Sequence, residues 1–126
     1  MQTKIEALRA ARSIWEDIVR KGDDTAKWEV TDGEYLNDCP CCQFTYDSQK
    51  VFDTHIVYTD KGYPELSCSK YCPMATYWTS ELSYDEYMCE HDTSPYAEWV
   101  ENPTTENAKA VLALVKQAIK DLEGKL

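Results

Sequence analysis

The chain has 126 residues and a formal net charge of −10, with 43% hydrophobic and 29% charged residues, a composition typical of one globular domain. No apolar run approaches the roughly 18 residues that a membrane-spanning helix needs, so we expect a cytoplasmic protein without membrane contact. In a reducing compartment, six clustered cysteines are more often metal ligands or redox groups than structural disulfides.

Charge divides the chain into three parts. Residues 1–22 hold five basic and three acidic side chains, and residues 107–126 hold four and two, so each end carries +2. Residues 23–106 hold four lysines against eighteen Asp and Glu, which gives −14, and they contain all six cysteines. We therefore expect one domain with an N-terminal helix (1–22), an acidic centre (23–102) and a C-terminal helix (103–124).

The first predicted element is an amphipathic helix. Thr3 and Glu6 have the spacing of a capping box, and Gly22 can adopt the left-handed conformation that often ends a helix. Between these points apolar residues recur at helical spacing, namely Ile5, Leu8, Ala11, Trp15, Ile18 and Val19. Such a stripe must be buried against another element.

The acidic centre gives weaker signals. Residues 44–52 can form a short helix after the Cys-Pro-Cys-Cys turn. Residues 55–58 have the β-branched and aromatic composition of a strand, with residues 63–67 as its partner. Further along, residues 83–86 read as a capping box, and Ser94-Pro95 places a capping serine before a proline at the first helical position.

The last predicted element is a second amphipathic helix. It follows Asn102-Pro103-Thr104, ends at Gly124, and has an apolar face formed by Ala108, Val111, Leu112, Val115, Ala118, Ile119 and Leu122. The two terminal stripes can bury each other, so we expect these helices to pack together, antiparallel. Dimerisation through the same stripes is the alternative, which leaves monomer or homodimer open.

These elements predict a mainly α fold with a small irregular or β element. The two terminal helices pack together around a central region that is held by zinc. The zinc prediction rests on the cysteines, because Zn²⁺ prefers four thiolate or imidazole ligands in a tetrahedron. Cys39 and Cys42 are two residues apart with a proline after the first, a spacing that lets both reach one metal ion. We predict one structural zinc ion bound by four of the five cysteines Cys39, Cys42, Cys68, Cys72 and Cys89.

Other roles for these residues stay open. Cys41 is expected to point away from a metal that Cys39 and Cys42 hold. Buried cysteines can also simply fill a core, and Cys39 with Cys42 has the spacing of a dithiol redox couple. His91 follows Cys89 by two residues and could replace one thiolate.

The order of motifs is Cys39-Pro40-Cys41-Cys42, then Cys72-Pro73, Cys89 and Ser94-Pro95-Tyr96, followed by an amphipathic helix. Over roughly residues 36–122 this order resembles a group of small, uncharacterised bacteriophage proteins. The resemblance implies a zinc-bound fold and a phage-encoded protein in the host cytosol, and it implies no activity. The chain differs from the group in having three residues, instead of two, between Cys68 and Cys72.

The functional prediction follows from charge and from missing motifs. A zinc deaminase needs a cysteine at position 44, which is Phe44, and neither histidine is followed two residues later by Glu. We therefore expect no enzyme, with a zinc- or thiol-dependent enzyme acting on a small substrate or protein disulfide as the alternative. A region with a charge of −14 does not neutralise phosphates, so direct nucleic-acid binding by this face is not expected.

The acidic, tyrosine-rich centre predicts one of two roles. It can bind a host protein with a basic surface, with carboxylates steering association and aromatic side chains providing contact area. Imitation of DNA toward a host nuclease, polymerase or defence factor is one form of this interaction. The other role is solubility alone.

Overall fold

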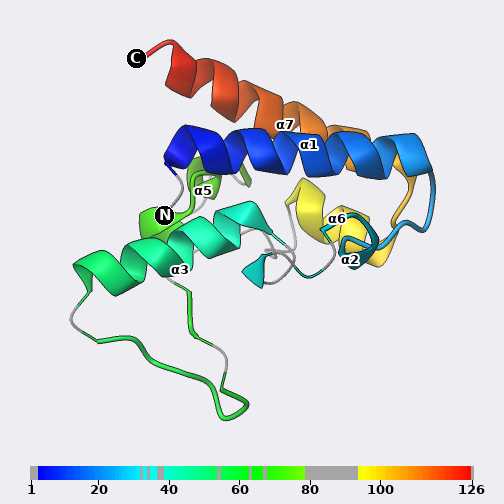
Figure 1. Ribbon diagram of the computed structural model, residues 1–126. Coiled ribbons are helices and arrows are strands. Elements are labelled where there is room, and N and C mark those ends of the chain that lie inside the picture. Colours follow the sequence, from blue (N-terminus) through cyan, green and yellow to red (C-terminus); the bar gives the residue numbers. More distant parts are fainter. Residues whose placement is uncertain are drawn as a thin grey trace.

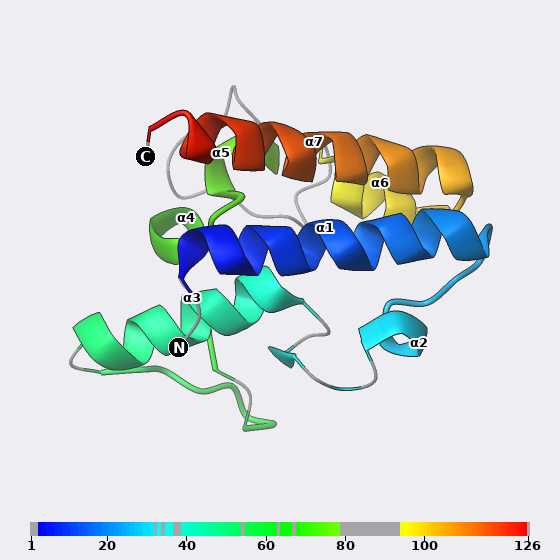
Figure 2. The same cartoon turned by 45° about the horizontal axis from the view of Figure 1, so that its top comes forward.

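The computed structural model describes residues 3–31, 33, 35–36, 39–53, 55–62, 64–66, 68–78 and 94–125. Within these residues the chain is mainly helical, and two long helices, α1 (Lys4–Lys21) and α7 (Thr105–Glu123), lie side by side (Figure 1). The shorter helices pack on one side of this pair and are α2 (Trp28–Thr31), α3 (Pro40–Phe52), α4 (Cys68–Tyr71), α5 (Ala75–Trp78) and α6 (Pro95–Glu101) (Figure 2). None of the helices in the described residues is long and apolar enough to cross a membrane.

Helix α1 begins and ends at the predicted residues. The Thr3 side chain accepts a hydrogen bond from the Glu6 N–H, and the Glu6 carboxylate accepts one from the Thr3 N–H at 3.0 Å. Gly22 follows the helix with a φ of 103°, and its N–H donates to the Ile18 carbonyl. The buried face of α1 consists of Ala7, Leu8, Ala11, Ile14, Trp15 and Ile18.

Helices α1 and α7 pack antiparallel, which confirms the predicted pairing of the terminal helices. Near one end the Arg9 guanidinium pairs with the Glu123 carboxylate at 3.4 Å, and near the other the Asp23 carboxylate accepts a hydrogen bond from the Thr105 N–H at 2.7 Å. The N- and C-terminal ends of the chain therefore lie on the same side of the molecule (Figure 1). Helix α7 contributes Ala108, Val111, Leu112, Val115, Ala118 and Ile119 to the core.

A group of aromatic side chains joins α6 to this pair. Ser94 caps α6 by accepting a hydrogen bond from the Ala97 N–H, as the Ser-Pro signal predicts. The Trp15 ring meets the Trp99 ring edge-on at 4.9 Å between centroids and the Tyr96 ring at 6.0 Å. Edge-to-face pairs of this kind add stability beyond their buried area, so α6 has a fixed orientation on α1.

Tyr77 attaches the central region to α7. Its hydroxyl donates a hydrogen bond to the Asp121 carboxylate at 2.7 Å. Burial, together with this bond, raises the pKa of Tyr77 to about 12, so the phenol stays protonated and keeps donating across the neutral range.

Two predictions for the centre need correction. The predicted helix at residues 44–52 is present but begins earlier, at Pro40, because proline is well suited to the first helical position. The predicted strand at residues 55–58 is wrong, since the described residues there make only an isolated bridge between Tyr58 and Pro64. Val57 and Tyr58 are half exposed, and strand-forming composition has no effect without a neighbouring surface to pack on. The capping box predicted at residues 83–86 lies outside the described residues.

The burial of α7 predicts a large difference between two valines in helices. Val111→Ala should lower the free energy of unfolding by about 2 kcal/mol, because Val111 is fully buried and its removal leaves a cavity. Val51→Ala, at a position that is 62% exposed on α3, should change it by less than about 0.5 kcal/mol. Urea unfolding of both variants measures the difference, and equal effects would contradict the α1–α7 core.

Candidate metal centre

The start of α3 sets the direction of three thiols. Cys39 caps the helix in an extended conformation, with φ −143° and ψ 119°, and its side chain makes no capping hydrogen bond. Pro40 occupies the first helical position, so Cys41 and Cys42 fall within the first turn. The Cys39 thiol is therefore available to its neighbours instead of to the helix backbone.

A fourth thiol comes from the segment after α4. Cys72 follows that short helix, and its carbonyl accepts a hydrogen bond from the Ala75 N–H at 3.1 Å, where α5 begins. Helix α4 is attached to the end of α3, because the Tyr71 hydroxyl donates to the Asp53 carboxylate at 2.6 Å and the Tyr71 ring stacks on Phe52. These contacts bring Cys72 to the start of α3.

The four thiols contact one another. The Cys41 thiol is hydrogen-bonded to those of Cys39 and Cys72, and the Cys39 thiol is also hydrogen-bonded to that of Cys42. Cys41 is 3% exposed, and all four cysteines are free thiols. Cys41 therefore points into this cluster, not away from it as the spacing suggested. The reason is local, since Cys39 is extended while Cys41 lies in a helix that turns back toward it.

These contacts give the thiols different acidities. Hydrogen bonds from Cys41 and Cys42, with a smaller contribution from the Lys27 charge, lower the pKa of Cys39 well below its ordinary value. The pKa of Cys41 is raised well above its ordinary value, because its thiol donates to Cys39 and Cys72 and is buried. The thiolate is the form that binds soft metal ions and acts as a nucleophile, so Cys39 is the most reactive member of the cluster.

Lys27 lies beside the cysteines, and the sequence-based prediction did not include it. Its ammonium is 4.7 Å from the centroid of the Tyr96 ring. Burial alone would lower the pKa of Lys27, but the charges of Tyr96, Cys39 and Cys42 outweigh it and the pKa is raised. One sequence signal could have identified this residue, because Lys27 is the only basic residue between positions 22 and 49.

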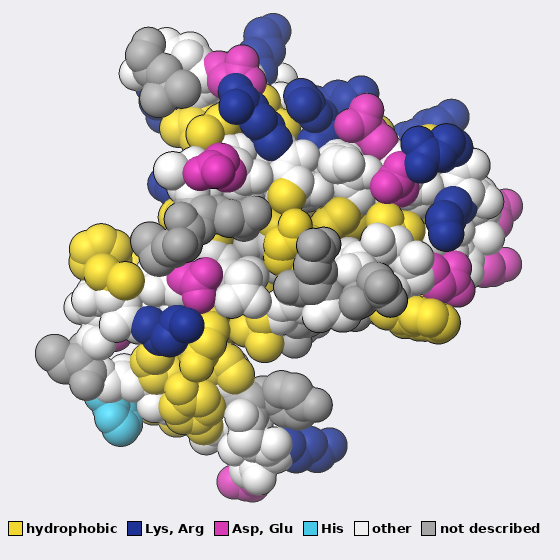
Figure 3. All heavy atoms as spheres, viewed as in Figure 1, with side chains coloured by type: hydrophobic (Ala, Val, Ile, Leu, Met, Phe, Trp, Pro, Cys, Tyr) yellow, Lys and Arg dark blue, Asp and Glu magenta, His cyan; other side chains and the backbone are white. Residues whose placement is uncertain are grey.

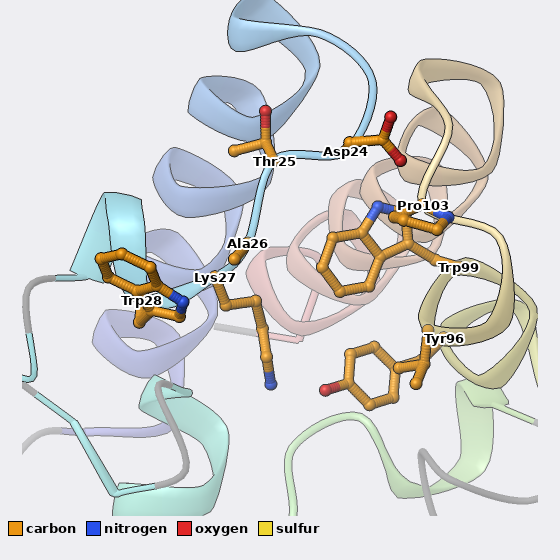
Figure 4. Close-up of a pocket in the computed structure, with 9 residues that line it drawn as sticks. Asp24, Thr25, Ala26, Lys27, Trp28, Tyr96, Trp99 and Pro103 are labelled. Carbon is orange, nitrogen blue, oxygen red and sulfur yellow. The ribbon is translucent and has the colours of Figure 1, made fainter.

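Lys27 also lines a cavity of about 360 Å³ on the surface. One wall is the segment from Asp24 to Trp28, and the other is α6 with Pro103. Figure 4 shows the Lys27 side chain running from the first wall toward the Tyr96 hydroxyl, with the Trp28 and Trp99 rings on opposite sides. The cavity therefore gives one approach to the side of Lys27 that is opposite the backbone of its own segment.

The predicted zinc ligands are only partly described. Cys39, Cys42 and Cys72 belong to the thiol cluster, together with Cys41. The side chain of Cys68, and all of Cys89 and His91, lie outside the described residues. Among the residues that are described, no group of three or more His, Cys, Asp or Glu side chains is placed to hold a metal ion. The zinc site thus stays a prediction, with its cysteine donors partly assembled.

Comparisons with known protein families, with curated proteins and with solved structures found no match. The interpretation of function therefore rests on the chemistry of the thiol cluster and of the surface around it.

The different acidities predict an order of alkylation in chelator-treated protein near pH 7. Cys39 should react with iodoacetamide before Cys41, because its pKa is lowered and its side chain is only partly buried. Cys41 should stay protected, since its pKa is raised and it is buried. Mass spectrometry of proteolytic peptides from a time course gives both rates, and faster modification of Cys41 would contradict the described hydrogen bonds.

Proposed function

We propose that this chain is a non-enzymatic interaction protein whose acidic centre is ordered by one structural zinc ion. The observation that supports it is the meeting of thiols from two separate segments, the start of α3 and the end of α4. Cys39 and Cys42 would bind the metal together with two of the three remaining candidates, Cys68, Cys72 and Cys89. A zinc ion closed by four thiolates supplies folding energy, not catalysis.

The donor set fits this role. Thiols are preferred zinc ligands, and several of these are buried or partly buried close to one another. The surrounding structure also needs support, because α2, α4 and α5 have four residues each. Helices this short are not stable alone. A metal-mediated link between α3 and α4 would therefore order the part of the chain that has the weakest local structure.

The proposed partner is a protein with a basic surface. Residues 23–106 carry −14, and such a charge steers association with a basic partner. Apolar side chains at the end of α3 and in the loop after it provide a contact area, which we call the α3 patch (Figure 3). Its members and their exposed fractions are Val51 62%, Phe52 70%, Val57 50% and Tyr58 51%.

The phage resemblance makes this partner a host protein in the bacterial cytosol. Nucleic-acid-binding enzymes carry the basic surfaces that an acidic protein would occupy, so inhibition of such an enzyme, by imitation of DNA, is the form of interaction that we propose.

A thiol-dependent enzyme is the second candidate, and one observation favours it. The lowered pKa of Cys39 beside the ammonium of Lys27 is typical of reactive cysteines. This role requires a metal-free Cys39, whereas the structural role requires a metal-bound one. Zinc content of the purified protein therefore separates the two.

The zinc proposal predicts that metal and fold depend on each other. Native mass spectrometry should find one zinc ion per chain, and a strong chelator should remove it with a loss of helical circular dichroism. Cys39→Ser and Cys42→Ser should both lose the metal, while His55→Ala, at an exposed position in the loop after α3, should retain it. A fully folded protein without metal would refute the structural role.

The interaction proposal predicts salt-dependent capture of basic proteins. The tagged chain should retain basic proteins from a bacterial lysate at roughly 0.05 M salt and release them at roughly 0.5 M, because salt screens surface charges. Phe52→Ser in the α3 patch should reduce capture, and Val100→Ser, at a position that is 55% exposed on α6, should not. Capture of nothing above background at low salt would contradict the proposal.

A further inference from the structure

Lys27 occupies a fixed place in the fold. It lies in the segment between α1 and α2, which is tied to both long helices. The Asp24 N–H donates to the Pro103 carbonyl at 2.7 Å, and the Thr25 hydroxyl donates to the Gly22 carbonyl at 2.9 Å. The paired helices therefore determine where the Lys27 side chain starts.

The ring of Tyr96 determines where that side chain ends. Tyr96 is 8% exposed and is packed against Trp15, Trp78 and Trp99, so its ring cannot easily move. The Lys27 ammonium lies over this ring and is hydrogen-bonded to the Tyr96 hydroxyl. Figure 4 shows the two side chains approaching each other from opposite walls of the cavity.

The same ammonium acts on the cysteines. It is close enough to Cys39 and Cys42 for its charge to favour their thiolate forms. The other three lysines of the acidic centre lie elsewhere. Lys50 pairs with Asp47 at 3.3 Å, Lys70 pairs with Asp53 at 3.4 Å, and Lys61 is exposed in the loop.

A thiolate site in this region needs a positive charge. A zinc ion with four thiolates has a net charge of −2, and removing that charge from water is costly unless an opposite charge lies nearby. The surrounding region already carries −14, which adds repulsion. An ammonium held beside two of the sulfur atoms offsets both costs.

We infer that Lys27, held in place by Tyr96, is a positioning residue that balances the charge of Cys39 and Cys42 and sets how tightly the cysteine site retains zinc. This inference rests on the proposed zinc site. It extends the site beyond the cysteines to the Ser94-Pro95-Tyr96 element, whose first two residues start α6 and so orient Tyr96. Partners outside the ligand shell commonly change metal affinity by about 10- to 100-fold.

The test is competition with a chromophoric zinc chelator, using the folded, zinc-loaded full chain. Lys27→Met should weaken zinc binding by about 10-fold or more, because it keeps the apolar stem and removes the charge. Lys27→Arg should restore the affinity to within a few-fold of the parent. Lys50→Met is the matched control, since Lys50 also lies over a tyrosine ring, 4.6 Å from the centroid of Tyr46, and should leave the affinity unchanged.

Each outcome decides between charge and packing. Equal affinity in Lys27→Met and the parent overturns the inference while leaving the zinc site intact. A loss in Lys27→Met that Lys27→Arg does not restore assigns Lys27 a packing role and also overturns it. A parent protein that holds no zinc refutes the proposed function and the inference together. Should Lys27→Met fail to fold by circular dichroism, Lys27→Gln carries the same expectation with a polar side chain.

Discussion

Packing of α1 against α7 is the constraint on which the other elements depend. The two buried stripes form a pair of helices without help from the centre, and Trp15 on α1 then gives α6 a surface through Tyr96 and Trp99. The turn after α1 is tied to the start of α7 by the Asp23 carboxylate. Both walls around Lys27 are therefore built on this pair, and the cysteines are added from a third direction by α3.

The cysteine cluster shows how backbone conformation decides the direction of neighbouring side chains. Cysteines two residues apart are usually discussed as ends of a tight turn. Here the first is an extended cap and the next two belong to a helix, so Cys41 contacts Cys39 and also reaches Cys72. The same proline that marks the motif in the sequence causes this arrangement, because it starts the helix directly after Cys39.

The sequence predicts the terminal helices and α6 well, for reasons that are local. Thr3 with Glu6, Gly22 and Ser94 each mark a helix end by a hydrogen bond or a backbone conformation within a few residues. The strand at residues 55–58 fails because composition alone supplied no neighbouring strand. The contacts of Cys41 and Lys27 could not be predicted, since Cys72 and Tyr96 reach them from distant parts of the chain.

The charges near the cysteines and those on the surface act over different distances. Exposed carboxylates are screened within about 10 Å at 0.1 M salt, so they influence the approach of a partner and have little effect on a partly buried site. The Lys27 ammonium acts at short range, where salt has little access. A protein with eighteen acidic residues in its centre can therefore keep a stable thiolate site by placing one lysine correctly. Salt should consequently weaken partner binding much more than metal binding, which makes the two properties separable in one molecule.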